Sequence, residues 1–261
     1  MPATAPMPAT APMPAAGPLV IAHRGASSAY PEHSRPAYEK ALKDGADGLE
    51  CDVRLSRDGH LVLLHDRTLD RTSDQRGPVS QRSLAQLREI DFAGEAILTL
   101  DELIDLAGGA GRPVRLLVET KHPNRYGKAV EQRLLALLRK RGLDRPRDGD
   151  LVRVTVMSFS PLAVRRVRAL APSLPRVQLM DLIPPGLKPS RLPFGARIAG
   201  PGLELVRRRP DLVRRLKARG NDVYVWTVNE PSDVDLMLRL GVDAIITDRP
   251  AEVRAHLERV V

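Results

Sequence analysis

Aromatic residues, cysteines and long apolar runs are the features that this sequence has least of. Phe, Trp and Tyr make up 3% of its 261 residues, and Cys51 is its one cysteine. One cysteine excludes an internal disulfide and a cysteine-rich metal cluster. So few aromatic rings provide no stacking platform for single-stranded nucleic acid. No apolar run approaches the roughly 18 residues of a membrane-spanning helix, so we expect no stable insertion into a membrane.

The first 18 residues consist of three near-copies of a six-residue unit, MPATAP, MPATAP and MPAAGP. Closely spaced prolines are incompatible with a helix, so we predict a disordered tail over residues 1–18. The segment has neither the basic region nor the continuous apolar stretch of a signal peptide, which favours a cytoplasmic location. Residues 19–261 are predicted to form a single domain.

A net charge of +9 suggests a polyanionic partner, such as a nucleic acid, an anionic membrane surface or a phosphorylated substrate. The run Arg207-Arg208-Arg209 and the basic helix expected through Arg219 would be the binding surface of a nucleic-acid-binding protein. However, the cations are spread along the chain with acids between them. We therefore favour a solvated, arginine-rich surface and expect no nucleic-acid partner.

From residue 19 onward, short apolar runs alternate with amphipathic stretches. Strands are predicted at 19–24, 47–55, 61–65, 114–121, 152–159, 176–181, 196–200, 222–228 and 243–247. Helices are predicted at 36–43, 100–107, 126–141, 162–170, 210–219, 231–240 and 251–261. This repetition predicts an α/β fold, a TIM (β/α)₈ barrel, with a doubly wound open sheet as the alternative. Residues 47–65 instead predict a hairpin.

Two pairs of charged residues occupy predicted strands with a spacing of two. Glu50 and Asp52 form one pair, and Glu119 and Lys121 form the other. Residues i and i+2 of a strand point to the same side, so each pair projects together. Buried carboxylates cost several kcal/mol each without a counter-ion, and hard divalent cations prefer carboxylate oxygens. We therefore predict that Glu50, Asp52 and Glu119 hold one divalent cation.

His23 and Arg24 end the first predicted strand, and His65 ends the hairpin partner of the second. The C-terminal ends of barrel strands meet at one face, so these residues should lie beside the carboxylates. Histidines exchange protons near neutral pH, and Arg24 and Lys121 offer positive charge to phosphate oxygens. Each residue alone is compatible with a structural role, but together they predict hydrolysis of an anionic ester.

Other hypotheses fit the sequence less well. A barrel glycosidase also uses paired acids, but it requires aromatic platforms and no cluster of cations. A phosphodiesterase that cleaves membrane lipids would need an apolar docking rim, which we do not find. A barrel that binds a phosphorylated ligand without turnover is not favoured, because every catalytic position is filled. The remaining histidines are interpreted as structural or solvent-facing: His33, His60, His122 and His256.

Six stretches of the chain resemble the glycerophosphodiester phosphodiesterase family, particularly its actinobacterial members. They are AHRGASSAYPEHS, GADGLECDVRLSRDGHLVLLHDRTLDRT, LTLDELIDLA, VETKHPNRYG, VMSFS and YVWTVNEPSDVDLMLRLGVDAIITDRP. The resemblance implies a TIM barrel with a small insertion after the second strand. It also implies hydrolysis of small-molecule glycerophosphodiesters to glycerol 3-phosphate and an alcohol, assisted by Ca²⁺ or Mg²⁺. Lipid phosphodiesterases of the lysophospholipase D or phospholipase C type are the alternatives within this chemistry.

The resemblance also assigns roles to individual residues. By position, they are the paired catalytic histidines His23 and His65, the metal ligands Glu50, Asp52 and Glu119, the phosphate-binding residues Arg24 and Lys121, and the pocket-wall residue Trp226. The family's Pro-Glu-Asn-Thr stretch is Pro31-Glu32-His33-Ser34 in this chain. The glutamate is kept, whereas a histidine replaces the asparagine. The sequence does not indicate an oligomeric state.

Overall fold

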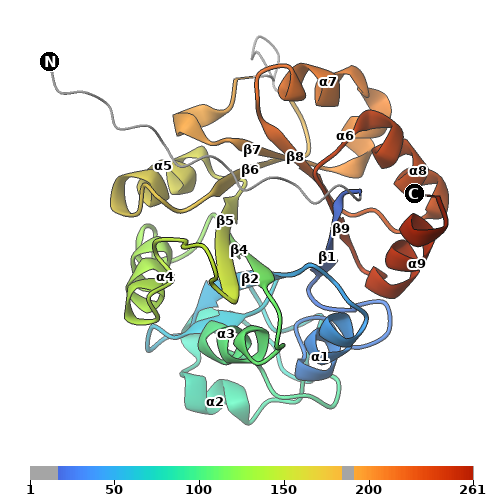
Figure 1. Cartoon of the computed structure of the whole chain (residues 1–261). Helices are drawn as coiled ribbons and strands as arrows, with labels where there is room; N and C mark the ends of the chain where they lie inside the picture. Colours follow the sequence, from blue (N-terminus) through green and yellow to red (C-terminus); the bar gives the residue numbers. More distant parts are fainter. Residues whose placement is uncertain (1–16, 184–190, 261) are drawn as a thin grey trace, which may run out of the picture.

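The computed structural model describes residues 17–183 and 191–260. Eight parallel strands form a ring at the centre of the molecule (Figure 1). They are β1 (Leu19–His23), β2 (Gly48–Leu55), β4 (Val114–Thr120), β5 (Val152–Ser158), β6 (Arg176–Met180), β7 (Ile198–Pro201), β8 (Asp222–Val225) and β9 (Ala244–Thr247). Because β1 pairs with both β2 and β9, the sheet is closed. The predicted TIM barrel is confirmed, and the open sheet is excluded.

Helices surround the ring of strands (Figure 1). They are α1 (Arg35–Lys43), α3 (Leu100–Gly108), α4 (Ala129–Lys140), α5 (Pro161–Leu170), α6 (Leu203–Arg208), α7 (Asp211–Lys217), α8 (Pro231–Leu240) and α9 (Pro250–Val260). Their apolar positions are buried at helical spacing, as shown in α4 by Val130, Leu134 and Leu138. No helix in the described ranges is long and apolar enough to cross a bilayer.

Residues 56–99 form the insertion expected after β2. Strand β3 (Leu61–Leu63) pairs antiparallel with β2, and a 3₁₀ turn η1 (Val79–Gln81) and a short helix α2 (Leu84–Arg88) follow it. The insertion has an apolar cluster of its own, formed by Val62, Leu64, Leu69, Val79, Leu87, Ile90, Phe92 and Ile97. The hairpin was predicted, but η1 and α2 are too short to show a helical period in the sequence.

Several boundaries differ from those predicted. The helix expected at 126–141 begins at Ala129, because the Asn124 side chain accepts the backbone N–H of Tyr126 and forms a turn. The helix expected at 210–219 is α7, and the separate helix α6 precedes it. Pro210 stands between the two helices and has no backbone N–H to continue a helical ladder. The tail expected at 1–18 lies outside the described residues as far as residue 16, so it stays a prediction, as does the single domain over 19–261.

Apolar side chains fill the inside of the barrel. Ten buried residues form this core: Leu19, Ile21, Leu117, Met157, Val177, Leu179, Ile198, Tyr224, Ala244 and Ile246. Trp226 packs against it just beyond the end of β8. Because the interior is packed, polar side chains from the strands are left to meet at an end of the barrel.

Gly25 connects β1 to the loop that leads to α1, and it permits a close approach to that helix. Its φ is +86°, and a Cβ atom at this position would lie 2.7 Å from the backbone carbonyl carbon of Ala37. We expect Gly25→Ala to lower the free energy of unfolding by roughly 2–5 kcal/mol. About 1–2 kcal/mol arises from the left-handed backbone, and about 1–3 from overpacking.

Denaturant unfolding measures this loss, and Gly45→Ala is the matched control. Gly45 has a φ of +77°, and a Cβ atom at this position would have no other atom within 4 Å. The control should therefore lose only the backbone contribution of about 1–2 kcal/mol. Equal losses in the two variants would contradict the steric argument.

Candidate active site

The C-terminal ends of β1, β2 and β4 carry most of the predicted site residues. His23 lies opposite Glu50 in the pairing of β1 with β2, and Asp52 lies opposite Glu119 in the pairing of β2 with β4. These four residues therefore occupy neighbouring positions on three adjacent strands. The spacing of two between Glu50 and Asp52 places both carboxylates on the same side of β2.

Asp52 lies at the centre of the charged cluster. Its Oδ2 lies 3.1 Å from Arg24 Nε and 3.0 Å from His33 Nε2, and its Oδ1 lies 2.9 Å from Lys121 Nζ. Burial opposes ionisation of this carboxyl group. The hydrogen bond from His33 and the charges of Lys121 and Arg24 outweigh burial and hold the pKa of Asp52 well below its usual value. Asp52 is therefore a buried carboxylate with three partners from two segments of the chain.

The loop between β1 and α1 delivers two of these partners in an uncommon backbone conformation. Arg24 has φ 58° and His33 has φ 62°, both in the left-handed region that non-glycine residues rarely occupy. The loop is closed by a hydrogen bond from His33 N to Arg24 O at 3.0 Å. Arg24 N also donates to the Glu50 side chain at 3.1 Å. Strain of this kind persists where surrounding contacts over-determine the backbone, which is common at functional sites.

His33 is buried, and it orients the carboxylate of Asp52. Its Nδ1 lies 2.7 Å from the Tyr38 hydroxyl. Burial lowers the pKa of His33, so the ring is neutral at neutral pH. Nε2 carries the hydrogen that Asp52 accepts, and the Tyr38 hydroxyl beside Nδ1 also lies within donating distance of the Glu50 backbone carbonyl, at 3.2 Å. The interpretation as a structural or solvent-facing residue missed this contact with the acidic cluster.

Glu50, Asp52 and Glu119 offer carboxylate oxygens that all lie within 4.8 Å of one another. Burial and the neighbouring charge of Asp52 raise the pKa of Glu119 to about 7 and that of Glu50 well above its usual value. The cationic side chains already present, including Lys121 at 2.9 Å from Glu119, thus do not suffice to keep all three carboxylates ionised. A set of hard oxygen ligands that lacks positive charge fits one divalent cation.

His23 is backed by a carboxylate that follows β9. Its Nδ1 lies 2.7 Å from Asp248 Oδ1, and the Asn229 amide donates to Asp248 Oδ2 at 2.7 Å. Burial by itself would raise the pKa of Asp248, but hydrogen bonds from His23, Asn229 and Ser27 lower it to about 2. The ionised Asp248 therefore accepts a hydrogen from Nδ1. Nε2 of His23 has no hydrogen-bond partner within residues 17–183 and 191–260.

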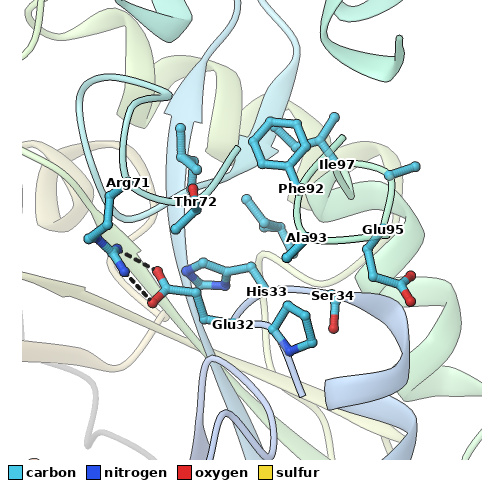
Figure 2. Close-up of a pocket in the computed structure, with 13 residues that line it drawn as sticks. Glu32, His33, Ser34, Arg71, Thr72, Phe92, Ala93, Glu95 and Ile97 are labelled. Carbon is cyan, nitrogen blue, oxygen red and sulfur yellow. Dashed lines mark hydrogen bonds and ion pairs between the residues drawn. The ribbon is translucent and has the colours of Figure 1, made fainter. Parts of the chain in front are cut away.

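His65 has a comparable partner in the insertion. Its Nδ1 lies 2.7 Å from Asp66 Oδ1, and Arg71 Nε donates to Asp66 Oδ2 at 2.6 Å. Arg71 also donates twice to Glu32, at 2.7 and 2.8 Å, as Figure 2 shows, and Glu32 in turn pairs with Arg24 at 3.2 Å. The hydrogen bond from Arg71 lowers the pKa of Asp66 to about 2. Burial, assisted by nearby cations, lowers the pKa of His65 below 6.5, so His65 is neutral at neutral pH.

Two cavities adjoin this part of the site. One, of about 290 Å³, is lined by His23 and Arg24 together with Ser27, Asn229 and Asp248, among others. The other, of about 250 Å³, lies beside the Glu32–Arg71 pair and is bounded by apolar side chains of the insertion, including those of Phe92 and Ile97 (Figure 2). The first cavity is the one that gives a ligand access to His23 and Arg24.

Trp226 is the predicted site residue with the least direct relation to the acidic cluster. Its Nε1 donates to Gly200 O at 2.8 Å, and its ring meets Phe159 edge to face at 5.4 Å between centroids. The half-buried indole thus covers the barrel core beyond β8. Its contact with a substrate stays a prediction.

Sequence reasoning missed the partners that orient the histidines. No role was predicted for Asp66 or Asp248, although an acid directly after His65 was a usable signal. Arg71 and Glu32 gave no such signal, because 39 positions separate them along the chain. The other histidines have partners elsewhere: His122 contacts Glu131, and His256 contacts Asp235.

Comparison with known proteins places this barrel in a family. The sequence matches the model of the glycerophosphoryl diester phosphodiesterase family over residues 23–252. It is 48% identical over 253 residues to the probable glycerophosphodiester phosphodiesterase 1 of Mycobacterium tuberculosis, covering 92% of each chain. It is 34% identical to the glycerophosphodiester phosphodiesterase of Caldanaerobacter subterraneus, covering 89% of this chain and 94% of the relative.

Solved structures show the same fold. A phosphodiesterase of Oleispira antarctica, in complex with the product sn-glycerol-3-phosphate, superposes with a TM-score of 0.79 at 26% identity. The match covers 92% of this chain and 97% of that one. The fold and site define a TIM-barrel phosphodiesterase. The chain belongs to the glycerophosphoryl diester phosphodiesterase family, and the predicted resemblance, including the actinobacterial one, is confirmed.

We expect a divalent cation, tested as Ca²⁺ and as Mg²⁺, to raise the thermal unfolding midpoint of the protein. A ligand that binds only the folded state stabilises it by about 2.7 kcal/mol at a hundred times its Kd. Glu50→Gln and Asp52→Asn each remove a charged ligand and should greatly reduce this shift. Differential scanning fluorimetry at increasing cation concentration measures the effect.

Glu258→Gln is the control, because Glu258 is exposed on α9 and lies outside the acidic cluster. It should keep the full shift. If Glu50→Gln and Asp52→Asn both kept the full cation-induced rise of the unfolding midpoint, these residues would not be the metal ligands.

Proposed function

We propose that this protein hydrolyses glycerophosphodiesters to glycerol 3-phosphate and an alcohol, assisted by one Ca²⁺ or Mg²⁺. The observation that carries the proposal is the convergence of three buried carboxylates with cationic side chains and two carboxylate-backed histidines at one end of the barrel. Membership of the family supports it, as does the product in the Oleispira antarctica structure. The substrate is therefore a small molecule.

The metal and phosphate sites are proposed as follows. Glu50, Asp52 and Glu119 hold the cation, which when bound supplies Lewis acidity and offsets the charge of a phosphodiester. Arg24, fixed between Asp52 and Glu32, presents a planar guanidinium whose remaining N–H groups bind phosphate oxygens. Lys121 balances the carboxylates and contributes positive charge to the same region.

We assign the two proton transfers of the reaction to the two histidines. His65 is neutral at neutral pH, so we assign it the removal of a proton from the nucleophile. His23 is oriented by Asp248 and exposes Nε2, so we assign it the protonation of the leaving alcohol. The nucleophile is either water or the glycerol 2-hydroxyl, and detection of a cyclic phosphate product distinguishes the two.

A nucleic-acid-binding function has less support from the surface. Arg207 pairs with Asp233 at 2.7 Å and with Glu204, and Lys217 pairs with Asp243 at 2.6 Å. The basic helices α6 and α7 lie on the outside of the barrel (Figure 1), and several of their charges are already balanced. These contacts support the proposal that the protein has no nucleic-acid partner. The cytoplasmic location and the absence of membrane insertion stay predictions.

We expect His23→Ala and His65→Ala each to lower kcat by roughly 10²–10⁴-fold, because general acid–base catalysis contributes about this much. The assay measures glycerol 3-phosphate released from glycerophosphocholine, glycerophosphoethanolamine and glycerophosphoglycerol, and lysophosphatidic acid or monoacylglycerol released from lysophospholipids, with each cation and with a chelator. His60→Ala is the control, because His60 is exposed and outside the site. Circular dichroism shows whether the variants keep the fold.

Four results would each contradict part of the proposal. A wild-type kcat in His23→Ala or in His65→Ala would show that the substituted histidine does not transfer a proton in the reaction. Absence of glycerol 3-phosphate from every glycerophosphodiester would contradict the proposed activity, and cleavage of lysophospholipids alone would favour the lipid phosphodiesterase alternative. Full turnover in excess chelator would exclude a metal.

The pH dependence of kcat/KM follows from His65. Because its pKa is lowered, His65 becomes protonated and unable to accept a proton only at pH values below 6.5. At saturating cation we therefore expect the acidic limb of the profile to have its midpoint below pH 6.5. Asp66→Asn removes a hydrogen bond that favours the protonated ring, so the limb should move to still lower pH. An acidic limb that moves to higher pH in Asp66→Asn would contradict the assignment of His65 as the proton acceptor.

A further inference from the structure

A third cavity, of about 300 Å³, lies between the insertion and the loop that follows β4. Four cationic side chains line it, and none of the described lining residues is an acid. The cationic residues are Arg54, Arg67, Lys121 and Arg125. Ser80, Asn124 and Tyr126 add polar groups. This composition is typical of a site for an anion.

The positive charge of this cavity is largely unbalanced. Arg54, Arg67 and Arg125 form no ion pair with a carboxylate in the described part of the chain, whereas Lys121 is engaged by Asp52 and Glu119. The guanidinium of Arg54 is partly buried, and this loss of contact with water lowers its pKa. Three unpaired guanidinium groups around one cavity repel one another unless an anion joins them.

The cavity adjoins the acidic cluster and His65. Arg54 follows Asp52 by two residues, so its side chain leaves β2 on the same side. Its Nε and Nη2 donate to the His65 backbone carbonyl at 3.0 and 2.6 Å. Lys121 lines the cavity and also contacts Asp52. A substrate whose phosphate lies at the acidic cluster can therefore extend into this cavity.

The walls of the cavity are fixed by hydrogen bonds within the protein. The Tyr126 hydroxyl donates to Ser80 O at 2.8 Å, which joins the loop after β4 to the insertion. The Asn124 side chain accepts from Tyr126 N at 2.9 Å and donates to Lys121 O at 3.1 Å. The cavity is thus preformed, which lowers the free-energy cost of binding.

The cavity beside His23 has a different charge. There, Glu32 and Asp248 accompany Arg24 and Arg249, so acids and bases are balanced. The two sides of the catalytic centre are therefore electrostatically distinct. The cationic side suits the more negative end of a substrate.

We propose that the cavity between the insertion and the β4–α4 loop is the subsite for the leaving alcohol, and that it selects alcohols that carry a phosphate group. Arg54, Arg67 and Arg125 bind this second phosphate, while the scissile phosphodiester lies at the acidic cluster. The part of this inference that concerns substrate specificity rests on the proposed function. The part that concerns binding of a phosphorylated alcohol to the cavity does not depend on that function.

The test compares two substrates that differ by one phosphate, glycerophosphoinositol and glycerophosphoinositol 4-phosphate. At low ionic strength we expect kcat/KM to be about tenfold higher for the phosphorylated substrate, because two or more ion pairs are gained, including those of the exposed Arg67 and Arg125. The double variant Arg67→Gln/Arg125→Gln should abolish this preference. Arg57→Gln is the control, because Arg57 is an exposed arginine of the same insertion outside the cavity.

Isothermal titration calorimetry with inositol 4-phosphate alone provides a readout that does not depend on turnover. Wild-type protein should bind it about tenfold more tightly than the double variant does. Equal kcat/KM for the two substrates, or equal affinity in wild type and double variant, would overturn the subsite. Loss of affinity in the double variant, with no turnover of either substrate, would uphold the subsite and contradict the proposed function.

Discussion

One buried negative charge, that of Asp52, determines how this end of the barrel is built. A carboxylate out of water without partners costs several kcal/mol, so its surroundings must supply cations and donors. They come from the end of β1, from the loop before α1 and from the end of β4, as Arg24, His33 and Lys121. The left-handed backbone at Arg24 and His33 is the local strain that these contacts offset. The positions of Arg24, His33 and Lys121 thus follow from the need to stabilise one buried acid.

The two histidines are fixed by different parts of the fold. His23 depends on Asp248, 225 residues away, which lies beside it only because β1 pairs with β9. His65 depends on its neighbour Asp66, which Arg71 joins to Glu32 in the loop after β1. One histidine is therefore placed by closure of the barrel and the other by attachment of the insertion. A disturbance of either element would be expected to displace one histidine before the other.

The sequence predicted the barrel and the cluster because both depend on short-range patterns. Strand and helix periods gave the alternation, and the spacing of Glu50 and Asp52 placed both side chains on one side of a strand. What it did not reveal depends on contacts between distant segments, such as the position of His33 on Asp52 and of Arg71 on Glu32. The helices α2 and α6 were missed because five or six residues are too few to display a helical period. The cationic cavity was also hidden, since its arginines come from separate segments.

The pairing of the first strand with the last has a consequence for how the molecule is made. During synthesis β1 emerges from the ribosome early, yet β9 and Asp248 emerge only after about 220 further residues, at a rate of roughly 5–20 residues per second. Until then one edge of β1 is unpaired and His23 lacks its carboxylate. The nascent chain therefore has an open strand edge for some tens of seconds, and the contact between His23 and Asp248 is assembled last.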